Sequence, residues 1–236
     1  MTRRRWIADE VSGNRAALTG DHARHLAQVL RAQVGQEFDI STGSEVRRGK
    51  ISDIHLDRVE FDLGESIAIA IETAITVAIS IFKFDRMEWA IEKCTELGVT
   101  RIVPVIAGRT EAHLAAASGK RAERWRRIAR QASQQSRRAS PPEISDPIKL
   151  KELYATLADT RIVLSETEDS RILKDAVPAN AGAVLLAFGP EGGWKDKEIA
   201  AFRDAGWTTA SLGPAILRAE TAVIAAVAIT AAVVKS

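Results

Sequence analysis

The sequence has almost no cysteine, and its positive and negative charges nearly balance. One cysteine, Cys94, among 236 residues excludes a disulfide framework. No group of cysteines and histidines has the spacing of zinc ligands, so a reducing cytoplasm and no bound metal are expected. The chain carries 33 lysines and arginines against 31 aspartates and glutamates. A net charge of +2 does not by itself indicate a nucleic-acid partner, because local clusters make phosphate contacts.

Long hydrophobic runs are missing as well. The apolar, uncharged run over residues 221–234 is shorter than the roughly 20 residues that a helix needs to cross a bilayer. We expect it to form a buried helix. The basic N-terminus is followed by charged and polar residues where a signal peptide has its apolar core, so neither secretion nor a membrane partner is expected. A content of 46% hydrophobic and 27% charged residues is typical of a globular protein and excludes disordered and fibrous classes.

The sequence pattern changes near residue 72. Upstream, short alternating segments with turns surround one predicted helix over residues 21–30, which indicates a small β-barrel. Downstream, apolar runs without polar alternation are separated by helical stretches, which is typical of a parallel sheet covered on both faces. We therefore expect a β domain over residues 1–71 and an α/β domain over residues 72–236. In the second domain, strands are expected over residues 75–81, 101–106, 161–164, 183–188 and 208–212, and helices over residues 85–97, 120–135, 148–158 and 196–205.

A glycine-rich loop directly follows the predicted strand over residues 183–188. It reads Phe188-Gly189-Pro190-Glu191-Gly192-Gly193-Trp194. In open α/β sheets, ligands bind outside the carboxyl ends of strands, and glycines allow the backbone to approach a ligand closely. The loop matches neither the dinucleotide nor the triphosphate glycine motif. Taken alone, it is equally consistent with a tight turn from strand to helix.

A second loop follows the last predicted strand and precedes the apolar helix. It reads Leu212-Gly213-Pro214-Ala215-Ile216-Leu217-Arg218-Ala219-Glu220-Thr221. Arg218 and Glu220 are the only charged residues between Asp204 and Lys235, so two charges are kept in a segment otherwise suited to the core. The alternative to a functional role is a structural ion pair or a carboxylate that favours the helix dipole.

Basic residues gather in the segment from Lys120 to Arg138. Eight of its side chains are basic and one, Glu123, is acidic. Such a local excess indicates contact with a polyanion, and we favour RNA. The alternative is a solvated helix face, although such faces usually mix both signs. Cys94 lies among apolar residues of a predicted helix and is interpreted as a core thiol.

Taken together, the two loops resemble the signature of the RsmE family, bacterial methyltransferases of the SPOUT class that act on N3 of a uracil in 16S ribosomal RNA. The similarity extends over nearly the whole chain. Lys83–Glu88, Lys93–Val99 and Ile102–Pro104 are similar to the family's opening strand-helix-strand. Gln131–Arg138 with Pro141-Pro142 resembles its RNA-facing segment. His25–Arg31 and Gly35–Gly43 are similar to its PUA-like barrel. The chain departs from the family's usual residue types at Gln134, Arg137 and Ala215.

The resemblance implies an α/β fold with a SPOUT-type trefoil-knotted parallel sheet and an N-terminal PUA-like β-barrel. It also implies S-adenosylmethionine bound within the knotted loops, a homodimer with the active site near the subunit interface, and 16S ribosomal RNA or the small ribosomal subunit as partner. The implied target is the uridine conventionally numbered 1498. Rival hypotheses are a related knotted enzyme with another target and a ribosome assembly factor without catalysis.

The resemblance and the loop pattern together give three groups of candidate residues. For catalysis, we expect Arg218 to stabilise the uracil anion and either Glu191 or Glu220 to accept its proton, the choice remaining open. The candidates for binding the methyl donor are Leu164, Phe188, Gly189, Pro190, Glu191, Gly192, Gly193, Leu212, Gly213, Ile216, Leu217 and Ala219. The candidates for binding RNA are Arg4, Arg24, Arg31, Lys83, Arg86, Arg124, Arg127, Arg137 and Arg138.

Overall fold

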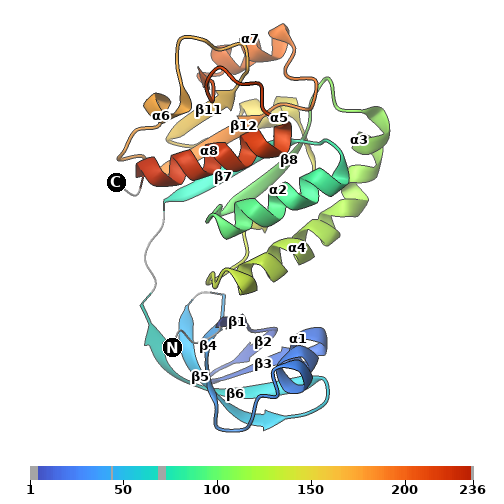
Figure 1. Ribbon diagram of the computed structural model, residues 1–236, viewed down its shortest axis with the longest axis vertical. Coiled ribbons are helices and arrows are strands. Elements are labelled where there is room, and N and C mark those ends of the chain that lie inside the picture. The colour runs from blue at the N-terminus through green and yellow to red at the C-terminus, as the bar shows by residue number, and fades with distance from the viewer. Residues whose placement is uncertain (1–4, 44, 69–72, 235–236) are drawn as a thin grey trace. The chain divides into compact units, whose positions relative to one another are not determined.

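The computed structural model describes residues 5–43, 45–68 and 73–234. Contacts divide the chain into two compact units (Figure 1). The first comprises Met1–Ile71 and Ser133–Ser140, and the second comprises Glu72–Ala132 and Pro141–Ser236. The segment 133–140, at the end of the basic stretch, is thus grouped with the first unit although it follows the predicted domain boundary. Its attachment includes a hydrogen bond that the Ser41 hydroxyl donates to the carbonyl of Ala139.

The first unit is built on a six-stranded sheet in the order β1-β4-β5-β6-β3-β2. Its elements are β1 (Arg5–Ile7), β2 (Glu10–Ser12), β3 (Arg15–Thr19), α1 (Gly20–Arg24), the π-helical turn η1 (His25–Val29), β4 (Glu37–Ser41), β5 (Val46–Ile54) and β6 (Arg58–Ile67). Strand β1 pairs with β4 in parallel, and the other pairs are antiparallel. The core contains Trp6, Leu18, Leu26 and Phe61, all buried. Burial therefore comes from alternate positions of short strands and from the predicted helix.

The second unit is built on a seven-stranded sheet in which every described pair is parallel. Its strand order is β10-β8-β7-β12-β11-β13, and β9 pairs with β8. Its strands are β7 (Ala74–Ser80), β8 (Arg101–Ile106), β9 (Glu143–Ile144), β10 (Ile148–Lys149), β11 (Thr160–Leu164), β12 (Ala183–Phe188) and β13 (Thr208–Ala210). Strands β8 and β10 lie on one side of β7, and the later strands β12, β11 and β13 lie on its other side. The strand order therefore reverses between β7 and β12, and α/β folds usually bind ligands at such a point.

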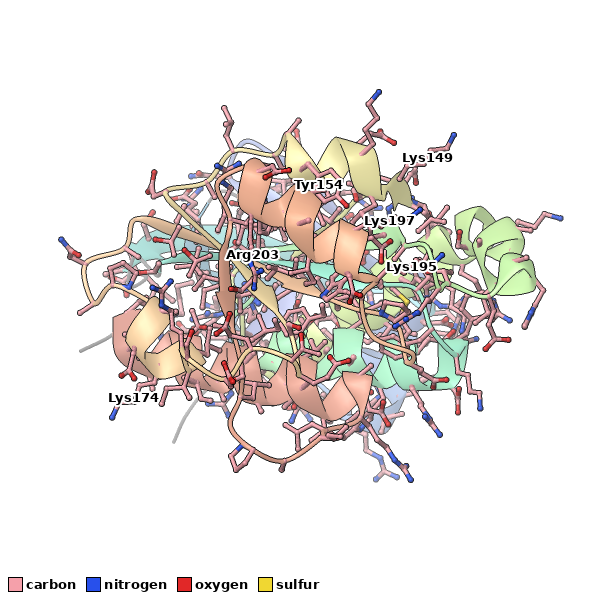
Figure 2. The ribbon with its side chains drawn as sticks, turned by 90° about the horizontal axis from the view of Figure 1, so that it is seen from above. Lys149, Tyr154, Lys174, Lys195, Lys197 and Arg203 are labelled. Atoms are coloured by element: carbon pink, nitrogen blue, oxygen red, sulfur yellow. The ribbon has the colours of Figure 1, made fainter. Side chains whose placement is uncertain are left out.

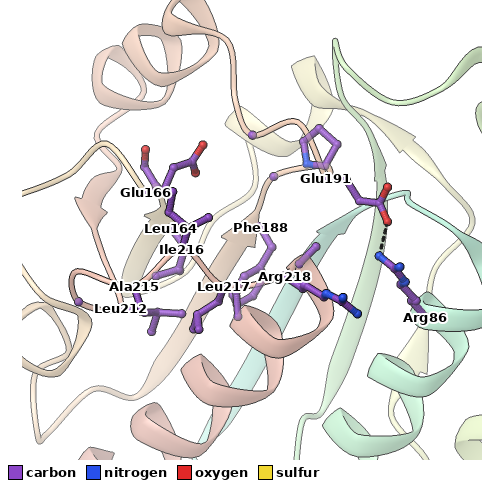
Figure 3. Close-up of a pocket in the computed structure, with 17 residues that line it drawn as sticks. Arg86, Leu164, Glu166, Phe188, Glu191, Leu212, Ala215, Ile216, Leu217 and Arg218 are labelled. Carbon is purple, nitrogen blue, oxygen red and sulfur yellow. Dashed lines mark hydrogen bonds and ion pairs between the residues drawn. The ribbon is translucent and has the colours of Figure 1, made fainter.

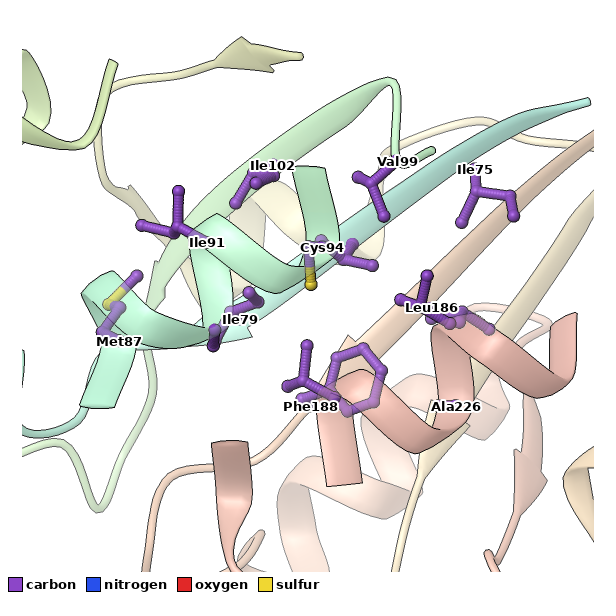
Figure 4. Packing of buried hydrophobic residues seen from close by; sticks show 14 of the residues in the cluster. Ile75, Ile79, Met87, Ile91, Cys94, Val99, Ile102, Leu186, Phe188 and Ala226 are labelled. Carbon is purple, nitrogen blue, oxygen red and sulfur yellow. The ribbon is translucent and has the colours of Figure 1, made fainter. Parts of the chain in front are cut away.

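Helices cover both faces of this sheet, as the runs of apolar residues predict. They are α2 (Phe84–Glu96), α3 (Ala112–Ser118), the 3-10 turn η2 (Gly119–Arg121), α4 (Ala122–Gln135), α5 (Leu150–Tyr154), α6 (Leu173–Ala176), α7 (Asp196–Asp204) and α8 (Ala219–Val234). Ile75, Val77 and Ile79 of β7 share one hydrophobic cluster with residues of α2, α4, α6 and α8 (Figure 4). Ala78 belongs to the opposite cluster, which includes α5 and α7. Alternate strand positions therefore fill two separate cores.

Aromatic packing fills the core beneath α5 and α7. Phe202 of α7 lies at the centre, with ring centroids 4.8 Å from Tyr154, 5.1 Å from Trp194 and 5.0 Å from Trp207. Figure 2 shows Tyr154 on α5 beside α7. Partial burial, followed by the charge of Glu198, raises the pKa of Tyr154 to about 12. The phenol is therefore neutral at physiological pH and packs as part of this core.

Positive backbone φ angles end two of the predicted helices where the sequence places glycine. Gly98 after α2 has φ 100°, and Gly206 after α7 has φ 79°. Such angles are strained for side-chain-bearing residues and explain the glycine in each case.

The predicted helix over residues 148–158 is wrong in its extent. Only Leu150–Tyr154 is helical, because Ile148 and Lys149 pair in parallel with Val105 and Ile106 of β8 instead. The edge of the sheet satisfies their backbone groups, and Pro147 before them favours an extended start.

Cys94 and α8 match their predicted places in the core. Cys94 is fully buried on α2, and burial raises the pKa of its thiol to about 12, so it is protonated and inert at neutral pH. Helix α8 covers the expected run, with Val223, Ala226 and Val227 buried. Within the described parts of the chain, no helix has the length and apolarity to span a membrane.

Candidate functional site

A cavity of about 440 Å³ lies at the carboxyl ends of β11, β12 and β13 (Figure 3). Three loops form its walls because parallel strands present these ends at the same edge of the sheet. Every residue predicted to bind the methyl donor lines this cavity except Gly192. Of the candidates for catalysis, Arg218 and Glu191 also line it. The two glycine-proline loops, about twenty residues apart in sequence, are therefore adjacent walls of one site.

The loop after β12 is held by contacts from other elements. Arg109, in the loop after β8, donates from Nη1 to the carbonyls of Gly192 at 2.6 Å and Trp194 at 3.0 Å. The Trp194 indole donates to the carbonyl of Leu164 at the end of β11 at 2.9 Å. Gly193 has φ 68°, and a Cβ there would lie 2.2 Å from Oε1 of Glu166. The loop is thus fixed on both sides, and its glycine is required by both conformation and space.

A buried carboxylate fixes the end of the same loop. Glu198 of α7 is 5% exposed and accepts hydrogen bonds from the backbone N–H of Lys195 at 2.7 Å and of Gly108 at 2.8 Å. The first bond caps the start of α7, and the second ties that helix to the loop after β8. Glu198 therefore has a structural role, with both oxygens hydrogen-bonded.

Another carboxylate, Glu168, orders the loop after β11. Its pKa is lowered to about 2, chiefly by hydrogen bonds from the side chains of Ser170 and Thr209, then by the Ser170 backbone N–H and the charge of Arg203. The Ser170 backbone bond is 2.9 Å long, and the nearest Arg203 nitrogen lies 3.7 Å away. Thr209 belongs to β13, the strand that leads into the third wall of the cavity. Glu168 therefore connects the loop after β11 to that strand.

One guanidinium holds both carboxylates proposed as the proton acceptor. Arg86, in the first turns of α2, donates from Nη1 to Oε1 of Glu191 at 2.9 Å. Its Nε lies 3.7 Å from Oε1 of Glu220, which is 7% exposed. The other oxygen of Glu220, Oε2, is buried without a hydrogen-bond partner among the described residues. Arg86 was predicted to contact RNA, and the structure places it in the wall of the cavity.

The third wall is exposed and partly apolar. Ile216 is 87% exposed and Leu217 is 37% exposed, so two adjacent large aliphatic side chains face solvent here. Arg218 follows them at the rim, exposed, and the part of the chain that the structure describes offers it no ion pair. Figure 3 shows Arg218 between Leu217 and Arg86. A cation, a pair of aliphatic side chains and open space therefore meet at this edge.

The residues predicted to bind RNA fall into both units. In the second unit, Lys83 and Arg127 are exposed, whereas Arg124 makes a two-pronged ion pair with Glu88 at 2.6 and 2.8 Å. The hydrogen bond and charge of Glu88 raise the pKa of Arg124. The basic face of α4 is therefore partly neutralised by α2, and Arg127 is its better candidate for a phosphate contact.

In the first unit, Arg24 pairs with Asp21 at 2.5 Å. Arg31 and Arg137 have positive φ angles of 51° and 60°, and Arg138 donates its backbone N–H to Ser133. Arg4 lies outside the described residues. The role of these residues in RNA binding stays a prediction.

Sequence reasoning missed several residues of the site, among them Ser165, Glu166 and Ala222 of the cavity wall and Arg109 behind it. Ser165 and Glu166 line the cavity directly after β11, and the rule that singles out loops after strands could have found them. Arg109 has no sequence signal, because its contacts to residues 192 and 194 depend on tertiary structure. Over residues 5–43, 45–68 and 73–234, no group of three or more histidine, cysteine or acidic side chains could hold a metal ion.

Comparison with known proteins gives matches over most of the chain. Residues 70–231 match the family model of an RNA methyltransferase domain, and residues 18–63 match that of an RNA methyltransferase PUA domain. Ribosomal RNA small subunit methyltransferase E of a Synechocystis species is 32% identical over 220 residues, covering 89% of this chain and 71% of that protein. The Mycobacterium tuberculosis protein of the same name is 33% identical over 236 residues, covering 93% of this chain and 86% of that protein.

Solved structures are similar over nearly the full length. Ribosomal RNA small subunit methyltransferase E from Neisseria gonorrhoeae, bound to S-adenosyl methionine, has a TM-score of 0.84 and 29% identity, with 96% of each chain covered. A putative methyltransferase from Legionella pneumophila, in complex with the bound cofactor SAM, has a TM-score of 0.86 and 27% identity, with 98% of each chain covered. The α/β sheet and the PUA-like domain predicted from the sequence are thus confirmed.

Replacing Glu168 with glutamine tests the role of this carboxylate in the loop after β11. Since its pKa is about 2 in the folded chain against an ordinary 4.5, ionised Glu168 stabilises the fold at neutral pH, and this contribution is lost as the pH falls from about 4.5 toward 2. We expect E168Q to lower the free energy of unfolding by roughly 1–2 kcal/mol at pH 7. Urea unfolding at a series of pH values measures the difference.

The exposed neighbour Asp169 provides the control, and D169N should change stability by less than about 0.5 kcal/mol. The difference between wild type and E168Q should shrink below about pH 4.5. A difference that is absent at pH 7, or that grows as the pH falls, would contradict this role of Glu168.

Proposed function

This chain belongs to the ribosomal RNA small subunit methyltransferase E family, and we propose that it methylates N3 of a uridine in 16S ribosomal RNA, the nucleotide conventionally numbered 1498. The methyl donor in this proposal is S-adenosylmethionine. The observation that carries the proposal is the cavity at the carboxyl ends of β11, β12 and β13, lined by both glycine-proline loops. The matches to the methyltransferase and PUA models over residues 70–231 and 18–63 support an enzyme acting on RNA.

The cavity fits the chemistry of S-adenosylmethionine. Its volume of about 440 Å³ lies in the range of small-molecule sites. Leu164, Phe188 and Leu212 offer apolar surface for a flat adenine ring. Gly213 has φ 108°, and a Cβ there would meet no atom within 4 Å, so the backbone borders open space where a ligand can approach it. The exposed carboxylate of Glu166 can accept hydrogen bonds from hydroxyl or ammonium groups.

The donor, when bound, supplies an electrophilic methyl group on a sulfonium. The residues of this chain then have to align the acceptor nitrogen and help its proton leave. Arg218 at the rim is the candidate to stabilise negative charge on the uracil oxygens as that proton leaves. Arg86 keeps Glu191 and Glu220 near the rim by pairing with both. Loops pinned by Arg109, Glu168 and Glu198 provide the rigid frame that such alignment requires.

Several surfaces are suited to the RNA. Arg127 is exposed on α4, next to Arg124, on a helix with a strong excess of basic residues. Arg31 is exposed in the first unit, which matches the PUA model. Phosphate contacts from such residues position an RNA without reading its sequence. The target base has to leave its stack to reach a cavity of this kind.

A homodimer in the cytoplasm completes the proposal. Ala225, Ala228 and Ala232 of α8 are partly or fully exposed although the helix is apolar on most sides. A second copy of the chain would cover this surface together with Ile216 and Leu217 beside the cavity. The proposed substrate, the small ribosomal subunit or its RNA, is found in the cytoplasm.

Mapping modified nucleosides by mass spectrometry tests the proposed target. We expect 16S RNA from a strain that lacks the gene to lose N3-methyluridine at position 1498 and to regain it on complementation. In parallel, calorimetric titration should show that the purified protein binds S-adenosylmethionine. An unchanged methyluridine at 1498 would reject the proposed target, and loss of a different modification would favour a related enzyme with another target. Failure to bind S-adenosylmethionine would reject the hypothesis that the protein is an enzyme.

Reversing the charge of Arg127 tests the RNA surface. We expect R127E to weaken binding of 16S RNA about tenfold or more at low salt, because one phosphate contact is lost and a repulsive charge is added. Affinity for S-adenosylmethionine should not change, since Arg127 does not line the donor cavity. Filter binding across a salt series measures the RNA affinity, and calorimetry measures the donor affinity.

Lys174 provides a matched control, because it is an exposed cation on α6 that is not among the predicted RNA contacts (Figure 2). K174E changes the net charge by the same amount. Equal RNA affinity for R127E and K174E would contradict a specific role for α4.

A further inference from the structure

A second cavity adjoins the donor cavity at the start of α8. It is lined by Asp85, Arg86, Trp89, Arg218, Glu220 and Thr221. Arg86 and Arg218 line both cavities, so the two lie side by side at these side chains. None of the residues predicted to bind the methyl donor lines the second cavity. A group lodged in it would therefore lie beside the donor without competing for the donor's place.

Trp89 is the exposed aromatic side chain of this cavity. It is 46% exposed on α2, whereas Met87, Ala90 and Ile91 beside it are fully buried. Asp85 and Arg86 lie four and three residues before it, so the three side chains share one face of the helix. The four other tryptophans, at positions 6, 125, 194 and 207, are each at most 6% exposed. A large ring left open to solvent beside cations is the kind of platform on which an unstacked base rests.

Glu220 provides the second, independent observation. It is 7% exposed, and its Oε2 has no hydrogen-bond partner among the described residues. A buried carboxylate oxygen without a partner is costly to the fold, so it indicates a ligand that supplies the missing hydrogen bond. Its neighbour in the cavity, Arg218, is exposed and likewise unpaired within the described structure. The cavity is thus lined by a carboxylate with one unsatisfied oxygen, an unpaired cation and an exposed aromatic ring.

We propose that this second cavity receives the target uracil, with Trp89 stacked on its ring and Oε2 of Glu220 taking the proton from N3. The inference rests on the proposed function and assigns a place to its acceptor. An N3–H is a single donor flanked by two carbonyl oxygens. Oε2 of Glu220 can accept a hydrogen bond from this N3–H, and Arg218 can donate one to a flanking carbonyl oxygen. A uracil therefore presents the hydrogen-bond partners that Glu220 and Arg218 lack.

The same geometry distinguishes Glu220 from Glu191. Oε1 of Glu191 accepts a 2.9 Å hydrogen bond from Arg86, and its side chain is 34% exposed. Glu220 is 3.7 Å from the same guanidinium through Oε1, and its Oε2 has no hydrogen-bond partner among the described residues. Arg86 and Asp85 from α2 and Arg218 from the loop before α8 are the charged groups that line the cavity with Glu220. Glu191 contacts Arg86 and holds it in place.

The reaction step balances with these groups alone and the methyl donor. The N3–H bond breaks, the proton moves to Oε2 of Glu220, and the electron pair stays on N3. A bond then forms between N3 and the methyl carbon while the carbon–sulfur bond breaks and leaves its electron pair on sulfur. The products are N3-methyluracil, S-adenosylhomocysteine and a protonated Glu220, which returns its proton to solvent. Positive sulfur and negative nitrogen neutralise each other, which suits a partly buried site.

Replacing Glu220 with glutamine tests the proton acceptor. We expect E220Q to lower kcat by about 10²–10⁴-fold while binding of S-adenosylmethionine, measured by calorimetry, is unchanged. The rate of E220Q should rise about tenfold per pH unit, because the proton has to leave to hydroxide in solution, while the wild-type rate varies less steeply. E220D, which keeps a carboxylate, should restore part of the rate and the wild-type pH profile.

Glu198 provides the comparison for a purely structural carboxylate. It is as buried as Glu220, but both of its oxygens are already hydrogen-bonded. E198Q should therefore lower stability without changing how the rate depends on pH. A wild-type kcat for E220Q, or a reduced kcat with the wild-type pH profile, would overturn the assignment of Glu220.

Replacing Trp89 tests the stacking platform by a readout other than activity. We expect a uridine-containing fragment of 16S RNA to quench tryptophan fluorescence in the wild type, and the quench to be lost in W89F, because the remaining tryptophans are buried. W89F should keep most of the RNA affinity because phenylalanine also stacks, whereas W89A should weaken it by about fivefold to 150-fold. L157A, which removes an 87% exposed aliphatic side chain elsewhere in the same unit, should bind RNA normally.

The outcomes separate this inference from the function on which it rests. If the wild type neither binds S-adenosylmethionine nor methylates 16S RNA, both fail. If the wild type is active but W89A binds and reacts normally, the stacking platform alone is rejected. If W89A instead changes the sedimentation of the protein from dimer to monomer, the exposed ring serves a second copy of the chain, and the assignment to the uracil is overturned.

Discussion

The structure depends on the parallel pairing of β11 between β12 and β13. Val163 of β11 lies beside Ala187 of β12 on one side and beside Thr209 of β13 on the other. Because all three strands run in the same direction, their carboxyl ends meet at one edge, and the loops that follow them converge there. Strand β12, buried along nearly its whole length, anchors this group to β7 through six residue pairs. The cavity is therefore a consequence of strand order.

Side chains from outside these loops turn the convergence into a defined site. Arg109, Glu168 and Glu198 each bind two or more groups of the loops or of the elements beside them. Arg86 joins α2 to the loop after β12 and to α8 through Glu191 and Glu220. These hydrogen bonds and ion pairs from charged side chains hold backbone that has little regular secondary structure. Rigid support of this kind is what transfer between two aligned groups requires.

Local pattern predicted five of the seven described strands of the second unit, most of its helices and both loops of the cavity, whereas β9, β10, α3 and α6 were not predicted. The central parallel strands are apolar at most positions, and Gly98 and Gly206 end helices because their positive φ angles are strained for residues with a side chain. The prediction of a longer helix near Ile148 failed because pairing with β8 overrides local helical propensity. The pairing of Arg124 with Glu88 and of Arg86 with two carboxylates could not be predicted, since each joins positions far apart in sequence. The small net charge gives no indication of the basic residues gathered on α4. Part of this basic face is neutralised by Glu88 of α2, which only the tertiary structure shows.

Hydrogen exchange measured by mass spectrometry, with and without S-adenosylmethionine, tests most directly whether the loops after β11, β12 and β13 form one donor site. Donor binding should slow exchange in residues 165–171, 189–195 and 212–219 together. Residues of β10 and of the first unit should exchange at unchanged rates. Protection confined to one of the three loops, or protection that appears elsewhere while these loops are unaffected, would contradict the account.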